Sequence, residues 1–168
     1  MKYYAGIGSR ETPYHVCEMM TTIARRLSSL DYICRSGGAP GADTAFENGA
    51  KYKQIFLPWD KFNGRFIDET SYIIPPYNGK YVFKYHPRAY KLTDAGKKLM
   101  SRNTYQILGL DLNTPVDFVL CWTKDGLASG GTGQAIRIAN DRRIPVFNLK
   151  TDIEKFSIYM SQTIIMSA

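Results

Sequence analysis

The chain has 168 residues, of which 44% are hydrophobic and 22% charged, and its 22 Lys and Arg against 15 Asp and Glu give a net charge of +7. This composition is typical of one soluble globular domain, and no apolar run approaches the ~20 residues of a membrane span. The N-terminus does not resemble a secretory signal, so we expect residues 1–168 to form a single cytoplasmic domain without a membrane segment.

Residues 2–57 alternate short apolar segments with helical patterns. Residues 2–7, 31–35 and 54–57 are typical of short strands. Between them, residues 16–30 carry apolar side chains at the spacing of a helix with one buried face, and residues 42–51 predict a second helix. Strands and helices that alternate with short connections indicate a parallel sheet covered by helices.

This pattern breaks down over residues 58–90, where turn-forming pairs alternate with aromatic residues. A long connection of this kind is usually functional, so we expect an aromatic insert or lid there. The rest of the chain predicts a helix over 93–109, a buried strand over 117–122, a glycine-rich loop over 126–133, a helix over 134–140, a strand over 145–149 and a closing helix over 152–166. The whole order predicts an α/β fold, Rossmann-like and doubly wound, with a mostly parallel sheet and helices on both faces.

The cysteines and the net charge narrow the choice of partners. Cys17, Cys34 and Cys121 are far apart and lie in apolar segments, so we expect free thiols, no metal and no bound cofactor. The positive charge favours an anionic partner such as a nucleotide or nucleic acid, although a solvated basic surface has the same composition.

Glycine and small hydroxyl residues follow three of the predicted strands. The carboxyl ends of parallel strands lie along one edge of a sheet, so the three loops are expected to converge there. Each leads into a predicted helix, whose free N–H groups attract phosphate, and glycine lets the backbone approach the anion. The expected phosphate-binding residues of these loops are Gly6, Gly8, Ser9, Ser36, Gly37, Gly38, Gly41, Gly130, Gly131, Thr132 and Gly133. A bulky residue at Gly8 is expected to abolish ligand binding without unfolding the protein.

The glycine spacing disfavours two common classes of nucleotide-binding protein. Glu11 stands where the dinucleotide fingerprint has its third glycine, and no Walker Gly-Lys-Ser/Thr sequence occurs. An ordinary dehydrogenase and a P-loop NTPase are therefore disfavoured.

Four charged residues are candidates for ligand binding or catalysis at this edge of the sheet. Arg10 and Arg102 are expected to bind phosphate, although Arg10 could instead pair at the surface with Glu11 or Asp43. Asp43 could accept a hydrogen bond from a ribose hydroxyl or cap its own helix. Glu47, one helical turn further on, could act as a base or nucleophile or be an ordinary solvated carboxylate.

Three blocks of sequence resemble the family of DNA-processing protein A (DprA/Smf). SGGAPGADTAFENGA over 36–50 is similar to the family's Ser-Gly-x-Ala-x-Gly-x-Asp signature, and SRNTYQILGL over 101–110 to its Arg-Asn block. SGGTGQAIRIA over 129–139, with IPVFNL after it, resembles the third block. The blocks occur in the family's order, within a wider SMF/LOG-like Rossmann group that also contains phosphoribohydrolases.

The resemblance implies a core domain that binds single-stranded DNA. The residues that match positions of the family's motifs, and that the resemblance implies contact DNA, are Arg10, Ser36, Gly37, Arg102, Asn103, Gly130 and Thr132. The alternative is a protein that binds a nucleotide or nucleotide derivative in order to sense it, sequester it or cleave its N-glycosidic bond. For cleavage, Glu47 and Asp43 would be the catalytic carboxylates. The phosphoribohydrolase pattern is incomplete, because Ser129 replaces its proline and Arg137 stands near its catalytic glutamate position.

Two further expectations concern binding surfaces. The insert carries aromatic residues that could stack on bases or pack a small core of their own: Tyr77, Tyr81, Phe83, Tyr85 and Tyr90. The resemblance is compatible with a homodimer, but no sequence feature defines an interface.

Overall fold

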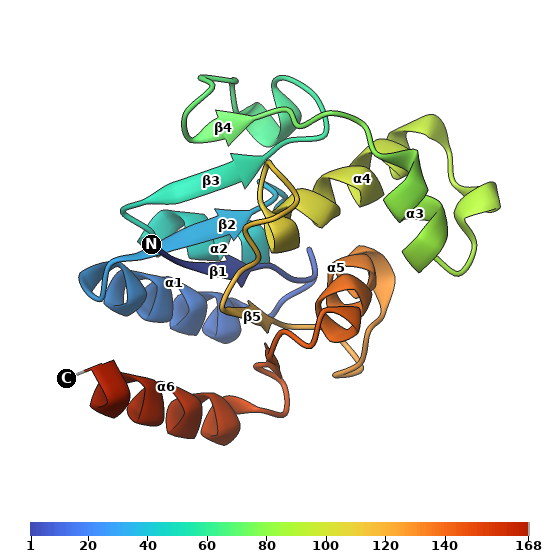
Figure 1. Cartoon of the computed structure of the whole chain (residues 1–168). Helices are drawn as coiled ribbons and strands as arrows, with labels where there is room; N and C mark the ends of the chain where they lie inside the picture. The colour runs from blue at the N-terminus through green and yellow to red at the C-terminus, as the bar shows by residue number, and fades with distance from the viewer. Residues whose placement is uncertain (168) are drawn as a thin grey trace.

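The computed structural model describes residues 1–167 and contains one parallel sheet (Figure 1). The strands follow the order β4-β3-β2-β1-β5-β6, and every neighbouring pair is parallel. Their bounds are β1 Lys2–Gly6, β2 Tyr32–Ser36, β3 Lys53–Phe56, β4 Tyr72–Ile73, β5 Phe118–Cys121 and β6 Val146–Asn148.

Helices cover both faces of the sheet. One face packs against α1 (Tyr14–Ser29), α2 (Ala42–Gly49) and α6 (Ile153–Ser167), and the other against α4 (Asp94–Leu108) and α5 (Gly130–Asp141). A further helix, α3 (Gly79–Tyr85), packs on α4 and α5, and two short 3-10 turns, η1 (Phe62–Gly64) and η2 (Ala89–Lys91), complete the fold. The predicted α/β, Rossmann-like doubly wound class is confirmed, with a sheet that is wholly parallel.

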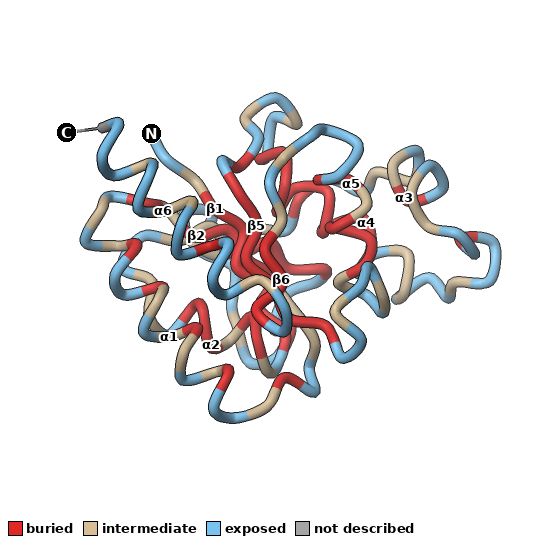
Figure 2. Tube along the Cα trace, turned by 90° about the horizontal axis from the view of Figure 1, so that it is seen from below, coloured by how far each residue is buried: buried red, intermediate tan, exposed pale blue. Residues whose placement is uncertain are grey.

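Aromatic packing organises the core on the α1 side of the sheet. Phe118 is fully buried in β5, which lies between β1 and β6, and its ring stacks on Tyr4 with centroids 5.8 Å apart. Phe156 and Tyr159 of α6 each pack at 5.6 Å from the same ring. Figure 2 shows the consequence: the central strands are buried, and exposed residues lie along the outer helices.

The expectation of an irregular insert over 58–90 is wrong in two places. Asp68 Oδ1 accepts hydrogen bonds from the backbone N–H groups of Thr70, Ser71 and Tyr72, and this turn leads into β4 at the sheet edge. Asn78 does not form a simple turn but caps α3, because its side chain accepts a hydrogen bond from the Tyr81 N–H. Asparagine is common in both roles, and the local sequence does not distinguish them.

The predicted boundary of α5 is also wrong. The helix begins at Gly130, not at residue 134, so the second half of the predicted glycine-rich loop, residues 130–133, forms its first turn. Glycine is a poor helix former, which explains the prediction. Tertiary packing requires it here, because a Cβ at Gly133 would lie 2.7 Å from the Ala128 carbonyl oxygen.

The strand order creates a crevice between β1 and β5. From β1 the chain moves outward through β2 and β3 to β4, then returns to β5 on the other side of β1 and continues to β6. The loops that follow β1 and β5 therefore diverge at the carboxyl end of the sheet. Open α/β sheets bind ligands at this kind of switch point.

Candidate functional site

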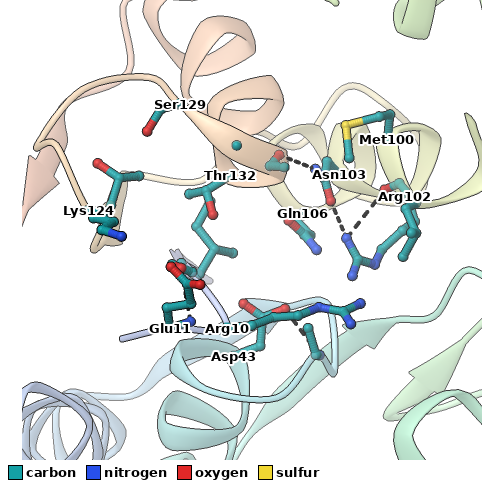
Figure 3. Close-up of a pocket in the computed structure, with 18 residues that line it drawn as sticks. Arg10, Glu11, Asp43, Met100, Arg102, Asn103, Gln106, Lys124, Ser129 and Thr132 are labelled. Atoms are coloured by element: carbon teal, nitrogen blue, oxygen red, sulfur yellow. Dashed lines mark hydrogen bonds between the residues drawn. The ribbon is translucent and has the colours of Figure 1, made fainter. Parts of the chain in front are cut away.

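A cavity of about 690 Å³ lies at the switch point between β1 and β5 (Figure 3). Its walls come from the loops after β1, β2 and β5, from the N-terminal turn of α5 and from the middle of α4. The predicted residues that line it are Gly8, Ser9, Arg10, Asp43, Arg102, Asn103, Gly130, Gly131 and Thr132. The other predicted residues, which do not line it, are Gly6, Ser36, Gly37, Gly38, Gly41, Gly133 and Glu47.

Several of the residues outside the cavity hold the first two loops together. Ser36 Oγ donates a 2.6 Å hydrogen bond to the Gly6 carbonyl oxygen. Gly41 has a positive φ of 84°, and a Cβ there would lie 2.7 Å from the Ser9 carbonyl oxygen. A Cβ at Gly6 would lie 2.5 Å from the Phe46 ring. These residues allow backbone segments to come into contact. They therefore shape the walls of the cavity without lining it themselves.

Gly8 lines the cavity but is also tightly packed. A Cβ at this position would lie 2.7 Å from the Ala42 Cβ and 3.0 Å from the Trp122 carbonyl oxygen. A bulky residue must therefore displace its neighbours, so from the structure we expect such a variant to disturb the fold, contrary to the expectation from the sequence. Gly37 and Gly38 are buried, and a Cβ at Gly37 would overlap Gln106 and the Arg102 guanidinium.

Arg102 places a buried positive charge at the cavity wall. Its side chain comes from α4, its residue is 6% exposed, and its Nη1 donates hydrogen bonds to Asn103 Oδ1 and to the Leu99 carbonyl oxygen. Its Nε is buried and has no hydrogen-bond partner in residues 1–167. Desolvation lowers the pKa of Arg102 to about 10, Asp43 partly opposes this shift and Arg10 adds to it.

Arg10 approaches Arg102 from the opposite wall. It lies in the loop after β1 and is exposed, whereas Arg102 is buried. The two guanidinium carbons lie 6.0 Å and 5.6 Å from the centroid of the Phe62 ring. Figure 3 shows the two side chains extending toward the same region of the cavity. The Arg10 charge lowers the pKa of Arg102, so the two cations repel each other, and an anion beside them would relieve this repulsion.

Asp43 is the buried carboxylate of the site. Desolvation raises its pKa, and the opposing influences are the Arg102 charge and the backbone N–H groups of Ala39, Gly8 and Gly37. The Ala39 N–H donates to Asp43 Oδ2 over 3.3 Å. The N-cap of α2 is Gly41, without a side-chain cap, so Asp43 connects the first two loops and does not cap its own helix.

The remaining polar walls offer donors. Asn103 Nδ2 donates to the Gly131 carbonyl oxygen over 2.9 Å and so joins α4 to the first turn of α5. Gly130, Gly131 and Thr132 line the cavity from that turn, where backbone N–H groups lack partners within the helix. Ser9 Oγ accepts a hydrogen bond from the Glu11 N–H and keeps its own hydrogen for a ligand. The arrangement is suited to an anion.

Glu47 does not reach this cavity. Its carboxylate forms a 2.7 Å ion pair with Arg65 Nη2, with both side chains largely buried, and Arg65 Nε donates to both carboxylate oxygens. Arg65 Nη2 also donates to Thr44 Oγ1, and its Nη1 donates to the Asn63 carbonyl oxygen. Glu47 thus anchors the segment after η1 to α2.

We expect Glu47→Gln to lower the free energy of unfolding by about 2 kcal/mol, because it leaves a largely buried guanidinium without its counter-charge. Urea titration of the variant measures this loss. The affinity of the cavity for anions should stay at the wild-type value. Unchanged stability together with lost ligand binding would place Glu47 in the site instead.

Comparison with known proteins gives one structural match. No family model matches the sequence, and no curated protein matches it. Among solved structures, DNA processing protein A from Helicobacter pylori superposes with a TM-score of 0.57 at 18% sequence identity. The chain has the fold of DNA processing protein A. The match covers 88% of this chain and 64% of that protein, so the chain spans less than two thirds of it.

Within this DNA processing protein A fold, sequence reasoning missed several wall residues. Gln106 is 2% exposed, lines the cavity and makes no side-chain hydrogen bond to residues 1–167. Lys124 lies on the rim, and Leu99 and Met100 supply apolar wall. The available signal was the run Ser101–Arg102–Asn103–Thr104, where consecutive polar residues are buried on all sides of one helix.

Residues 1–167 contain neither a candidate metal site nor a membrane-spanning helix. No cluster of three or more His, Cys, Asp or Glu side chains within residues 1–167 is arranged to hold a metal ion. No helix in the same part of the chain is long and apolar enough to span a bilayer.

Proposed function

We propose that the chain binds single-stranded DNA by holding backbone phosphates in the switch-point cavity. The observation that carries this proposal is Arg102, whose buried guanidinium has an unpartnered Nε and takes part in no ion pair within residues 1–167. A buried charge without a partner is costly unless a ligand supplies one. A phosphodiester oxygen is a suitable partner, since guanidinium groups match phosphate geometry.

Two observations favour a polynucleotide as the source of that phosphate. The net charge is +7, and Lys124 and Arg10 are exposed at the cavity. The structural neighbour, DNA processing protein A from Helicobacter pylori, binds single-stranded DNA. Long-range attraction to a charged strand and local phosphate contacts would then act together.

A second candidate is a free nucleotide or nucleotide derivative. A volume of about 690 Å³ is within the range of small-molecule sites. If such a ligand were cleaved at its N-glycosidic bond, Asp43 and Glu11 would be the carboxylates in reach, because both line the cavity and Glu47 is held by Arg65 outside it. A raised pKa would suit Asp43 to donate a proton.

The test is fluorescence anisotropy with a labelled oligothymidine of ~20 nucleotides at about 50 and 200 mM salt. We expect binding that weakens at least tenfold between the two salt concentrations, as neutralisation of several phosphates requires. Thymidine monophosphate in excess should compete poorly. Complete displacement by the mononucleotide would favour the second candidate, and absence of binding to either probe would refute both.

A further inference from the structure

A second cavity lies next to the first and shares Arg102 with it. It has a volume of about 310 Å³, at the small end of ligand cavities, and lies between the 58–90 segment and α4. Its walls include Trp59, Ile74, Pro75, Tyr77, Lys98 and Arg102. Arg102 is the residue that lines both cavities, so a ligand in either one lies beside Arg102.

The second cavity presents aromatic rings to solvent. Tyr77 is 56% exposed, and its hydroxyl makes no hydrogen bond to residues 1–167. Trp59 is 37% exposed, and its ring meets Phe62 edge to face with centroids 5.4 Å apart. Lys98 adds a positive charge at the wall. Exposed rings beside cations are the combination by which proteins bind single-stranded nucleic acid, through stacking and phosphate neutralisation.

The structure separates Tyr77 from the other aromatic residues of the insert. The rings of Tyr81 and Tyr85 stack on each other with centroids 5.9 Å apart. The Tyr81 hydroxyl accepts a hydrogen bond from Arg142, and the Tyr85 hydroxyl donates one to Asp141. Phe83 and Tyr90 are exposed but line neither cavity. Tyr77 therefore remains as the candidate for stacking, together with Trp59.

We propose that the second cavity receives one nucleobase of the strand whose phosphate lies at Arg102. This inference rests on the proposed function, and it names the nucleobase as the part of the strand that enters the cavity beside Arg102. A base is flat, has an apolar face and carries a phosphate on its own nucleotide, and these properties match aromatic rings, apolar prolines and the adjoining guanidinium. Because stacking does not read base edges, the site should accept different bases.

The experiment compares two labelled strands of equal length in the anisotropy assay: oligothymidine and a fully abasic strand with the same phosphates. Tyr77→Ala should weaken oligothymidine binding about tenfold and leave abasic-strand binding at the wild-type value. Tyr77 makes no hydrogen bond or ion pair in residues 1–167, so its loss should not disturb the fold. Tyr90→Ala, which removes an equally large exposed ring from the same segment, should leave both affinities unchanged.

Tryptophan fluorescence supplies an independent readout. Oligothymidine should quench the emission of the wild type, whereas the abasic strand should not, and Trp59→Phe should remove the quenching because Trp122 is buried. An equal loss of both strands in Tyr77→Ala, or an unchanged affinity for oligothymidine, would overturn the base site while the phosphate site stands. If the wild type bound neither strand, the proposed function itself would fail.

Discussion

Arg102→Gln is expected to reduce the affinity for single-stranded DNA about a hundredfold. A charge-assisted hydrogen bond to phosphate contributes about 1.5–3 kcal/mol, and the loss of two such bonds from a desolvated guanidinium gives at least this change. Arg102 also lines both cavities, so its removal affects a ligand that occupies either one. Anisotropy titration with labelled oligothymidine measures the effect.

The matched control for this variant is Arg25→Gln. Arg25 is exposed on α1 and lines neither cavity, so the substitution removes the same charge from the +7 total without touching the site. It should change the affinity less than threefold, as expected of a distant exposed charge. If both variants weakened binding equally, the attraction would come from net charge and not from the cavity.

The fold of Arg102→Gln requires its own check. Burial lowers the pKa of Arg102 to about 10, which means that its charge destabilises the folded state at neutral pH. A neutral side chain removes this cost, but Asp43 then loses a favourable neighbour. The double variant Arg102→Gln with Asp43→Asn removes both charges and distinguishes lost binding from lost structure. Circular dichroism and thermal melts of both variants report the fold.

Gly131→Asp is expected to have the second large effect, again about a hundredfold on DNA affinity. Gly131 lines the cavity in the first turn of α5, and a Cβ there meets only the flexible end of Met100, at 3.4 Å. A carboxylate at this position would face the phosphate and repel it. The same carboxylate suits the N-terminal end of a helix, so the variant should remain folded.

Gly131→Asn separates charge from bulk. Asparagine has nearly the shape of aspartate and no charge, so we expect it to lower the affinity less than tenfold. Equal losses for the two variants would mean that the side chain blocks the cavity sterically. Wild-type affinity in the aspartate variant would show that phosphate does not bind near the first turn of α5.

Local patterns predicted much of the sheet because they report burial directly. Within the predicted strand over 117–122, residues 118–122 are continuously apolar, and β5 lies there between β1 and β6. β4 consists of Tyr72 and Ile73 and exists through its pairing with β3, a contact that no local pattern contains. The position of Arg10 at the cavity followed from the rule that loops converge at the carboxyl edge of a parallel sheet, whereas Arg102 comes from the middle of α4, which that rule does not cover.

The roles of individual residues were harder to predict, since they depend on which side chains meet. Glu47 shares a helix with Asp43, yet its partner Arg65 comes from the insert and holds it outside the cavity. Gly6 and Gly41 occur in phosphate-loop patterns but allow loop-to-loop and loop-to-core contact. Trp59 and Tyr77 come together in one cavity only after the insert has folded against α4.

The contacts between the first two loops also bear on the kinetics of binding. Ser36 is hydrogen-bonded to the Gly6 carbonyl oxygen, Asp43 connects the two loops, and Gly41 packs against Ser9. These cavity walls are therefore in place before any ligand arrives. A preorganised site avoids much of the conformational entropy that an ordering loop loses. Association should therefore be governed by diffusion and electrostatic attraction, with a single fast phase and no slow isomerisation after encounter.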